Sequence, residues 1–124
     1  MKKIIILIPV YNDWDSLSKL LIEVNEKIKF FSDFNFECLI VNDASTSKLT
    51  KLDKPSNFKS VELLNMIENR GHARCNAFGI RYVFQNKEFD NLILMDGDGE
   101  DRPEEIKSLI EKIKENPNSS VVAK

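Results

Sequence analysis

The chain has 124 residues and a mass of 14.3 kDa, the size of one domain, and its 42% hydrophobic and 31% charged residues are typical of a folded globular protein. Its net charge of −2 argues against nucleic acid as a partner, and no apolar run approaches the ~20 residues that cross a bilayer. Cys38 and Cys75 are far apart in the chain, so we expect both to be reduced and to fill the core of a cytoplasmic protein.

Apolar runs and amphipathic segments alternate along the chain. Ile4–Val10 is a continuous apolar run that we interpret as a buried strand and not as a signal peptide, because it is short and Pro9 interrupts it. Periodic leucines predict the first helix, for which Asp13 or Asp15 supplies the N-cap. In chain order we expect a strand over 4–10, a helix over 15–31, a strand over 36–41, a polar loop over 42–57, a strand over 60–67, a helix over 72–86, a strand over 91–95, a helix over 103–115 and a strand over 119–123.

This alternation predicts an α/β fold, a doubly wound and mainly parallel sheet flanked by helices. No repeat or linker divides residues 1–124, so we expect one domain. Because the sequence stops within the last expected strand, we interpret the chain as truncated: a fragment, a natural short protein or half of an assembly. Strand edges left exposed in this way favour a homodimer.

A polar cluster follows each of the first four expected strands. The clusters lie at 9–13, 42–46, 68–72 and 96–101. Ligands of parallel α/β sheets bind beyond the carboxyl ends of the strands, and all four clusters are expected at that edge. Loops are polar in most proteins, so one cluster alone indicates little. Four clusters at one edge predict a binding site there.

The fourth cluster carries the most chemical information. Leu92–Met95 leads directly into Asp96, Gly97 and Asp98. Residues two apart in an extended segment face the same side, so the two carboxylates are expected together, and a divalent cation would offset their repulsion. Mg²⁺ and Mn²⁺ prefer such oxygen ligands. The alternative is an acidic turn that caps the next helix through Asp101, and both arrangements can hold at once.

Three other sites with an acidic turn fit this sequence poorly. An EF-hand loop would need Gly and Glu at the positions of Asp101 and Lys107. A phosphatase of the haloacid-dehalogenase type would have Thr in place of Glu100 and more chain after the motif. A receiver domain would place its phosphoacceptor after an apolar strand near mid-chain, whereas Asp53 lies in a polar segment.

Four motifs occur in a recognisable order, at 8–12, 41–46, 69–72 and 95–105. Together they resemble glycosyltransferase family 2, whose members use nucleotide sugars and have the GT-A fold. The second motif is Asn-Asp-Ala-Ser where the family often has Asp-Gly-Ser, and the fourth is its Asp-x-Asp motif with the Pro-Glu helix start. The third and fourth motifs are nearest to the polyprenyl-phosphate glycosyltransferases, the dolichol-phosphate mannose synthase-like branch. The resemblance implies the N-terminal, nucleotide-binding half of such a domain.

The resemblance also implies roles for the matched residues. The segment 9–11 lines the base pocket, Asp43 contacts the base or ribose, and Asp96 lies near the ribose and diphosphate. The implied nucleotide-sugar-binding residues are Pro9, Val10, Tyr11, Asp43, Asn69, Gly71, Asp96 and Gly97, and the implied ligands of Mg²⁺ or Mn²⁺ are Asp96 and Asp98. His72, the only histidine, is interpreted as a helix residue and not as a general base, so no catalytic residue is assigned.

The implied function is metal-dependent transfer of a sugar, of the hexosyltransferase type, from a UDP- or GDP-linked donor. The implied acceptor is a polyprenyl phosphate or a glycan. Two alternatives remain open: a non-catalytic nucleotide-sugar-binding module that works with a partner, and other nucleotide chemistry such as nucleotidyl transfer. The expected location is cytoplasmic, with a peripheral position at the inner face of the membrane as a second option.

Overall fold

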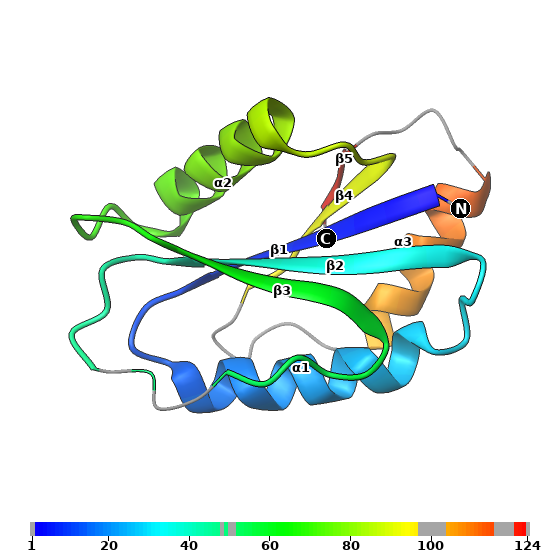
Figure 1. Ribbon diagram of the computed structural model, residues 1–124, viewed down its shortest axis with the longest axis horizontal. Coiled ribbons are helices and arrows are strands. Elements are labelled where there is room, and N and C mark those ends of the chain that lie inside the picture. The colour runs from blue at the N-terminus through cyan, green and yellow to red at the C-terminus, as the bar shows by residue number, and fades with distance from the viewer. Residues whose placement is uncertain (1, 48, 50–51, 97–103, 116–120, 124) are drawn as a thin grey trace.

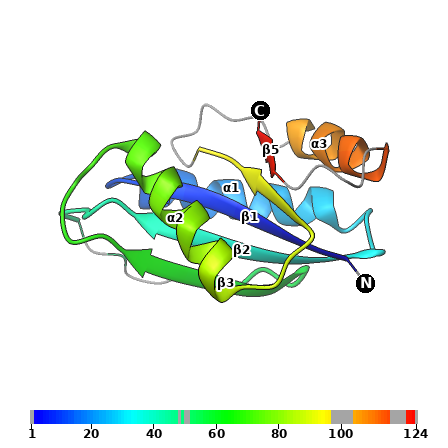
Figure 2. The same ribbon diagram turned by 90° about the horizontal axis from the view of Figure 1, so that it is seen from above.

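The computed structural model describes residues 2–47, 49, 52–96, 104–115 and 121–123. These residues form a five-stranded parallel sheet in the order β3-β2-β1-β4-β5, with α2 on one face and α1 and α3 on the other (Figures 1 and 2). The predicted doubly wound α/β fold is confirmed. The elements are β1 (Lys2–Val10), α1 (Trp14–Ile28), β2 (Phe34–Asn42), β3 (Phe58–Asn65), α2 (His72–Asn86), β4 (Asn91–Leu94), α3 (Glu104–Glu115) and β5 (Val121–Ala123).

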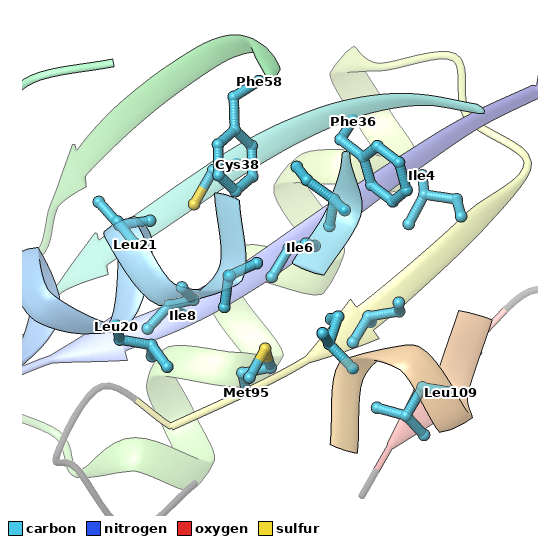
Figure 3. Close-up of a cluster of buried hydrophobic side chains, with 14 of the residues drawn as sticks. Ile4, Ile6, Ile8, Leu20, Leu21, Phe36, Cys38, Phe58, Met95 and Leu109 are labelled. Carbon is cyan, nitrogen blue, oxygen red and sulfur yellow. The ribbon is translucent and has the colours of Figure 1, made fainter. Parts of the chain in front are cut away.

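β1 is the central strand and is buried on both faces, as its unbroken apolar sequence predicts. It pairs in parallel with β2 from Lys2 to Val10 and with β4 from Ile4 to Leu7. The side chains of Ile4, Ile6 and Ile8 face α1 and α3 (Figure 3). Ile5 and Leu7 instead belong to the cluster beneath α2. Alternation along one strand therefore supplies both halves of the core.

Both cysteines are free and buried, in agreement with the sequence-based expectation. Cys38 packs with Phe36 and Phe58 on the side covered by α1 (Figure 3). Burial raises the pKa of the Cys38 thiol far above its ordinary value, so the thiol is protonated and inert. None of the helices in the described ranges is long and apolar enough to cross a membrane.

Several element boundaries differ from the prediction, and two of the differences have a clear physical reason. β3 covers 58–65 and not 60–67, because Phe58 is buried opposite Phe36 whereas Ile67 is 97% exposed. α1 ends at Ile28, and Phe31 stays buried through a turn in which its N–H donates to the Ile28 carbonyl at 3.0 Å.

The N-cap of α1 is also different in detail. Asp13 occupies the N-cap position, and its carbonyl accepts the N–H of Leu17 at 3.1 Å. Its carboxylate, however, makes no capping hydrogen bond, and Asp15 lies within the first turn. The residue expected to begin the helix does so, but side-chain capping by Asp13 was a wrong expectation.

Close packing of α2 on the sheet explains why the helix has a glycine, Gly79, in its interior. A Cβ atom at this position would lie 2.6 Å from Cδ1 of Leu7 and 3.0 Å from Cγ2 of Val41. Leu7 and Val41 are fully buried in the sheet, so an added methyl would have to displace core side chains. The glycine allows the helix to approach β1 and β2 closely, which offsets its low helix propensity.

We expect Gly79→Ala to lower the free energy of unfolding by about 1–3 kcal/mol, because the added methyl overpacks the core. In an open helix the same change would raise stability by about 0.4–1 kcal/mol. Urea unfolding measures the sign directly. In a Leu7→Ala background, where space is available, the cost of Gly79→Ala should disappear. A stabilised Gly79→Ala single variant would contradict the close approach.

Candidate functional site

The carboxyl ends of the strands meet at one edge of the sheet, because every pairing is parallel. The loops that leave β1, β2 and β3 lie together at the left of Figure 1. The sequence-based prediction that the polar clusters share this edge is confirmed for their described residues. The direction in which successive strands are added to the sheet also changes at β1. β2 and β3 are added on one side of β1, whereas β4 and β5 are added on the other side. Such a switch point is where doubly wound sheets bind their ligands.

Tyr11 and Asp96 flank this switch point. Tyr11 directly follows β1, and the residue is 40% exposed. Met95 continues the pairing of β4 with β1, since its N–H donates to the Leu7 carbonyl at 3.0 Å. Asp96 is the next residue and is half-buried. An exposed aromatic ring and a carboxylate therefore leave neighbouring central strands at the same edge.

Asn12 connects the loop after β1 to the loop after β2. Its side-chain Oδ1 accepts the backbone N–H groups of Thr46 at 2.8 Å and Ser47 at 2.9 Å. Its own N–H donates to Oγ of Ser45 at 2.8 Å. Asn12 adopts a left-handed backbone conformation, with φ of 57°, which asparagine tolerates better than most residues. The Asn12 side chain thus provides the acceptor for two backbone N–H groups of the loop after β2, which lie beyond the paired strands.

The turn after β2 contains a second left-handed residue, Ala44, whose φ is also 57°. Oδ1 of Asn42 accepts the N–H of Ser45 at 3.0 Å and stabilises the turn, while Nδ2 of Asn42 donates to Oδ1 of Asn65 at 2.9 Å. A non-glycine residue in this region carries a steric cost from its Cβ atom. The position therefore favours glycine, which agrees with the Asp-Gly-Ser form of the family motif.

Asp43 is buried, with 1% of its surface exposed. Its Oδ1 accepts the N–H of Arg70 at 2.7 Å and its Oδ2 accepts the N–H of Gly71 at 2.9 Å. Nδ2 of Asn69 donates to the Asp43 carbonyl at 3.3 Å. The end of β2 is thereby fastened to the segment that precedes α2, and the third motif is brought beside the second.

The other sequence-predicted site residues are placed unevenly. Pro9 and Val10 are buried within β1, so of the expected base-pocket segment only Tyr11 presents its side chain to the surface. Asn69 and Gly71 are exposed on the loop after β3. Their roles in nucleotide binding stay predictions.

The expected metal site is described only in part. Asp96 lies at the predicted edge, whereas Gly97 and Asp98 lie outside the described residues. Across the ranges that the structure describes, no group of three or more His, Cys, Asp or Glu side chains could hold a metal ion. The Asp96–Asp98 pair therefore remains a prediction of the sequence.

Sequence reasoning assigned no role to Asn12 or to a cavity beside the end of β3. The cavity has a volume of about 350 Å³ and is lined by Asn65, Met66, Ile67, Glu68, Arg70 and Phe78. Asn12 carried a usable signal, since asparagine after a strand is typical of left-handed turns. The cavity carried none, because the spacing of Phe78 in its helix does not distinguish a cavity wall from a core position.

Comparison with known proteins identifies the class. The model of the family described as Glycosyl transferase family 2 matches residues 5–124. The chain belongs to glycosyltransferase family 2, which confirms the resemblance seen in its motifs.

Two relatives are undecaprenyl-phosphate 4-deoxy-4-formamido-L-arabinose transferases. The protein from Proteus mirabilis (strain HI4320) is 30% identical over 111 residues, which are 89% of this chain and 33% of the relative. The protein from Klebsiella pneumoniae (strain 342) is 29% identical over 116 residues, 93% of this chain and 35% of the relative. The chain thus spans about a third of the length of these curated relatives.

We expect Ala44→Gly to raise the free energy of unfolding by about 0.5–1 kcal/mol, because it removes the left-handed strain and only part of the gain is lost to unfolded-chain entropy. The matched control is Ala77→Gly, at an exposed position in α2, which should lower stability by about 1 kcal/mol. Thermal or urea unfolding of both variants gives the two signs. A destabilised Ala44→Gly variant would contradict the strained turn.

Proposed function

We propose that this domain binds a nucleotide-diphosphate sugar at the carboxyl edge of its sheet and serves its transfer to an acceptor. One observation carries the proposal: Tyr11 and Asp96 flank the switch point between β1 and β4 in a chain of glycosyltransferase family 2. The exposed ring of Tyr11 offers a surface on which a nucleobase can stack. Asp96, which follows the end of β4, would face the diphosphate and its counter-ion.

The proposed cofactor is Mg²⁺ or Mn²⁺, held by Asp96 and Asp98. Two carboxylates suit these ions, which complete their coordination with water and with substrate phosphates. The carboxylate oxygens of the motif are suitable ligands for a divalent ion. Such an ion, when bound, would stabilise the negative charge of the departing nucleoside diphosphate. Asp96 and Asp98 would orient the diphosphate, and Gly97 would leave room for its approach.

The remaining proposed contacts lie around this centre. Pro9 and Val10 would shape the base pocket through their backbone, since their side chains are buried. Asn69 and Gly71 would border the nucleotide from the loop that precedes α2, where both are exposed. The nucleotide would be that of a UDP- or GDP-linked donor.

The proposed acceptor is a polyprenyl phosphate. The supporting observation is that the relatives from Proteus and Klebsiella are named as undecaprenyl-phosphate transferases. A phosphate acceptor is already an anion, so it needs less help from a general base than a hydroxyl does. A glycan acceptor is the alternative. A peripheral position at the membrane and a homodimer formed through edge strands belong to the same proposal.

Calorimetric titration with UDP and with GDP, each with and without Mn²⁺, tests the proposed site. We expect one nucleotide to bind in the presence of Mn²⁺, and Asp98→Asn to weaken that binding by about tenfold or more because a metal ligand is lost. The matched control is Asp33→Asn, the same change at the opposite edge of the sheet. There, Oδ2 of Asp33 lies 3.7 Å from Nζ of Lys114. Its affinity should equal that of the unsubstituted protein.

Release of free sugar from the donor then distinguishes transfer from binding alone. Binding accompanied by sugar release supports a transferase, and binding without release supports a nucleotide-sugar-binding module. If the Mn²⁺-dependent affinity of Asp98→Asn is unchanged, the metal assignment is wrong. If neither nucleotide binds, the proposed donor site is wrong.

A further inference from the structure

Two arginines and a phenylalanine form an exposed stripe on α2. Arg74, Phe78 and Arg81 follow one another at spacings of four and three residues, so they lie on one side of the helix. All three residues are exposed. The sequence of α2 contains no acidic residue, although the whole chain has a net charge of −2. This side of the helix is therefore both basic and aromatic.

The stripe continues into the loop after β3. Ile67 of this loop has the highest exposed fraction among the described large hydrophobic residues, at 97%. Ile67 and Phe78 line the same cavity of about 350 Å³, together with Met66 and Arg70. Scattered single apolar residues are normal on a protein surface, but a contiguous group marks an interaction surface. We name Ile67, Arg70, Arg74, Phe78 and Arg81 the α2 surface.

The positive charge of the α2 surface comes from two of its three arginines. Nη2 of Arg70 lies 2.7 Å from Oε2 of Glu68, and this ion pair has no net charge. Arg74 and Arg81 provide the excess charge from within α2. Guanidinium groups bind phosphate oxygens through paired hydrogen bonds, so their preferred partner is a phosphate-bearing, anionic surface.

The α2 surface adjoins the proposed donor site. β3 ends at Asn65 and α2 begins at His72, so the intervening loop lies at the carboxyl edge of the sheet (Figure 1). Ile67 and Arg74 are close to this edge in the chain, and Arg81 lies about 10 Å further along the helix axis. A partner bound to the α2 surface would therefore be next to the site where the donor sugar is proposed to bind.

A second exposed aromatic residue, Phe30, lies at the other edge of the sheet. It precedes β2, whereas the α2 surface begins after β3 ends. Nζ of Lys107 is 4.5 Å and Nζ of Lys29 is 5.4 Å from the centroid of its ring, so the ring already has cationic partners within the protein. Phe30 and Lys29 therefore provide matched controls.

We infer that the α2 surface docks on an anionic lipid bilayer. Ile67 and Phe78 enter the headgroup region, and Arg74 and Arg81 bind lipid phosphates. Apolar contact combined with basic charge is the chemistry by which peripheral proteins bind such bilayers. The inference rests on the proposed function, in which the acceptor is a polyprenyl phosphate and the domain is peripheral to the membrane, and it names the surface that makes the contact.

Co-sedimentation with vesicles tests the inference without any nucleotide. The protein should bind vesicles of phosphatidylcholine that contain phosphatidylglycerol, should not bind phosphatidylcholine alone, and should be released by salt. Arg74→Gln and Arg81→Gln should each lower the binding constant by about fivefold, which corresponds to about 1 kcal/mol for one basic residue at an anionic surface. Ile67→Ser should also weaken binding, because it removes apolar contact.

Two substitutions at the amino edge serve as matched controls. Lys29→Gln removes a positive charge and Phe30→Ser removes an exposed apolar side chain, and both should bind vesicles as the unsubstituted protein does. The inference is wrong if the protein fails to bind phosphatidylglycerol, or if the controls lose as much binding as the α2 variants. It is also wrong if sedimentation equilibrium shows a dimer that Ile67→Ser dissociates, since a second copy would then cover the surface.

Nucleotide titration separates this inference from the proposed donor site. Arg81→Gln should bind UDP or GDP with Mn²⁺ as the unsubstituted protein does, because Arg81 is remote from the carboxyl edge. Nucleotide binding without vesicle binding would overturn the docking surface and leave the donor site supported. Vesicle binding that depends on Arg74 and Arg81, without nucleotide binding, would support the docking surface and refute the donor site.

Discussion

Parallel pairing of the strands is the constraint on which the candidate site depends. A parallel sheet must be covered on both faces, and β1 meets this requirement with Ile4, Ile6 and Ile8 on one side and Ile5 and Leu7 on the other. The same pairing brings every strand end to one edge, so loops far apart in sequence become neighbours. The hydrophobic core and the position of the site are therefore consequences of one arrangement.

At that edge the backbone needs partners that the sheet cannot provide. Asn12 supplies acceptors to the loop after β2, and Asp43 supplies them to the segment before α2. Each side chain binds a loop other than its own, so the loops after β1, β2 and β3 are connected in series. Left-handed backbone at Asn12, Ala44 and Gly71 allows the tight turns that these contacts require. Such a preorganised edge suits a ligand that must be held in one orientation.

The sequence alone predicted the fold class, the order of the elements and the shared edge of the polar clusters, because apolar periodicity and alternation report directly on burial. It misplaced β3 by two residues, since Met66 and Ile67 extend an apolar pattern that the sheet does not use. By local propensity Gly79 only weakens a helix, whereas the close approach to Leu7 and Val41 favours a glycine there. Such contacts join residues far apart in the chain, and no local pattern contains them.

The motifs determined which chemical groups this protein brings to its sheet edge and to which family it belongs, since residue type and order are properties of the sequence itself. Only the tertiary structure decided which of those groups are buried, exposed or hydrogen-bonded. It buried Asp43 against two backbone amides, left Tyr11 exposed and placed Tyr11 and Asp96 at the ends of the two strands between which the order reverses. The physical reason is that exposure and hydrogen bonding depend on which distant segments pack together, and an aspartate in a motif has the same letter whether it faces a ligand or the protein's own backbone.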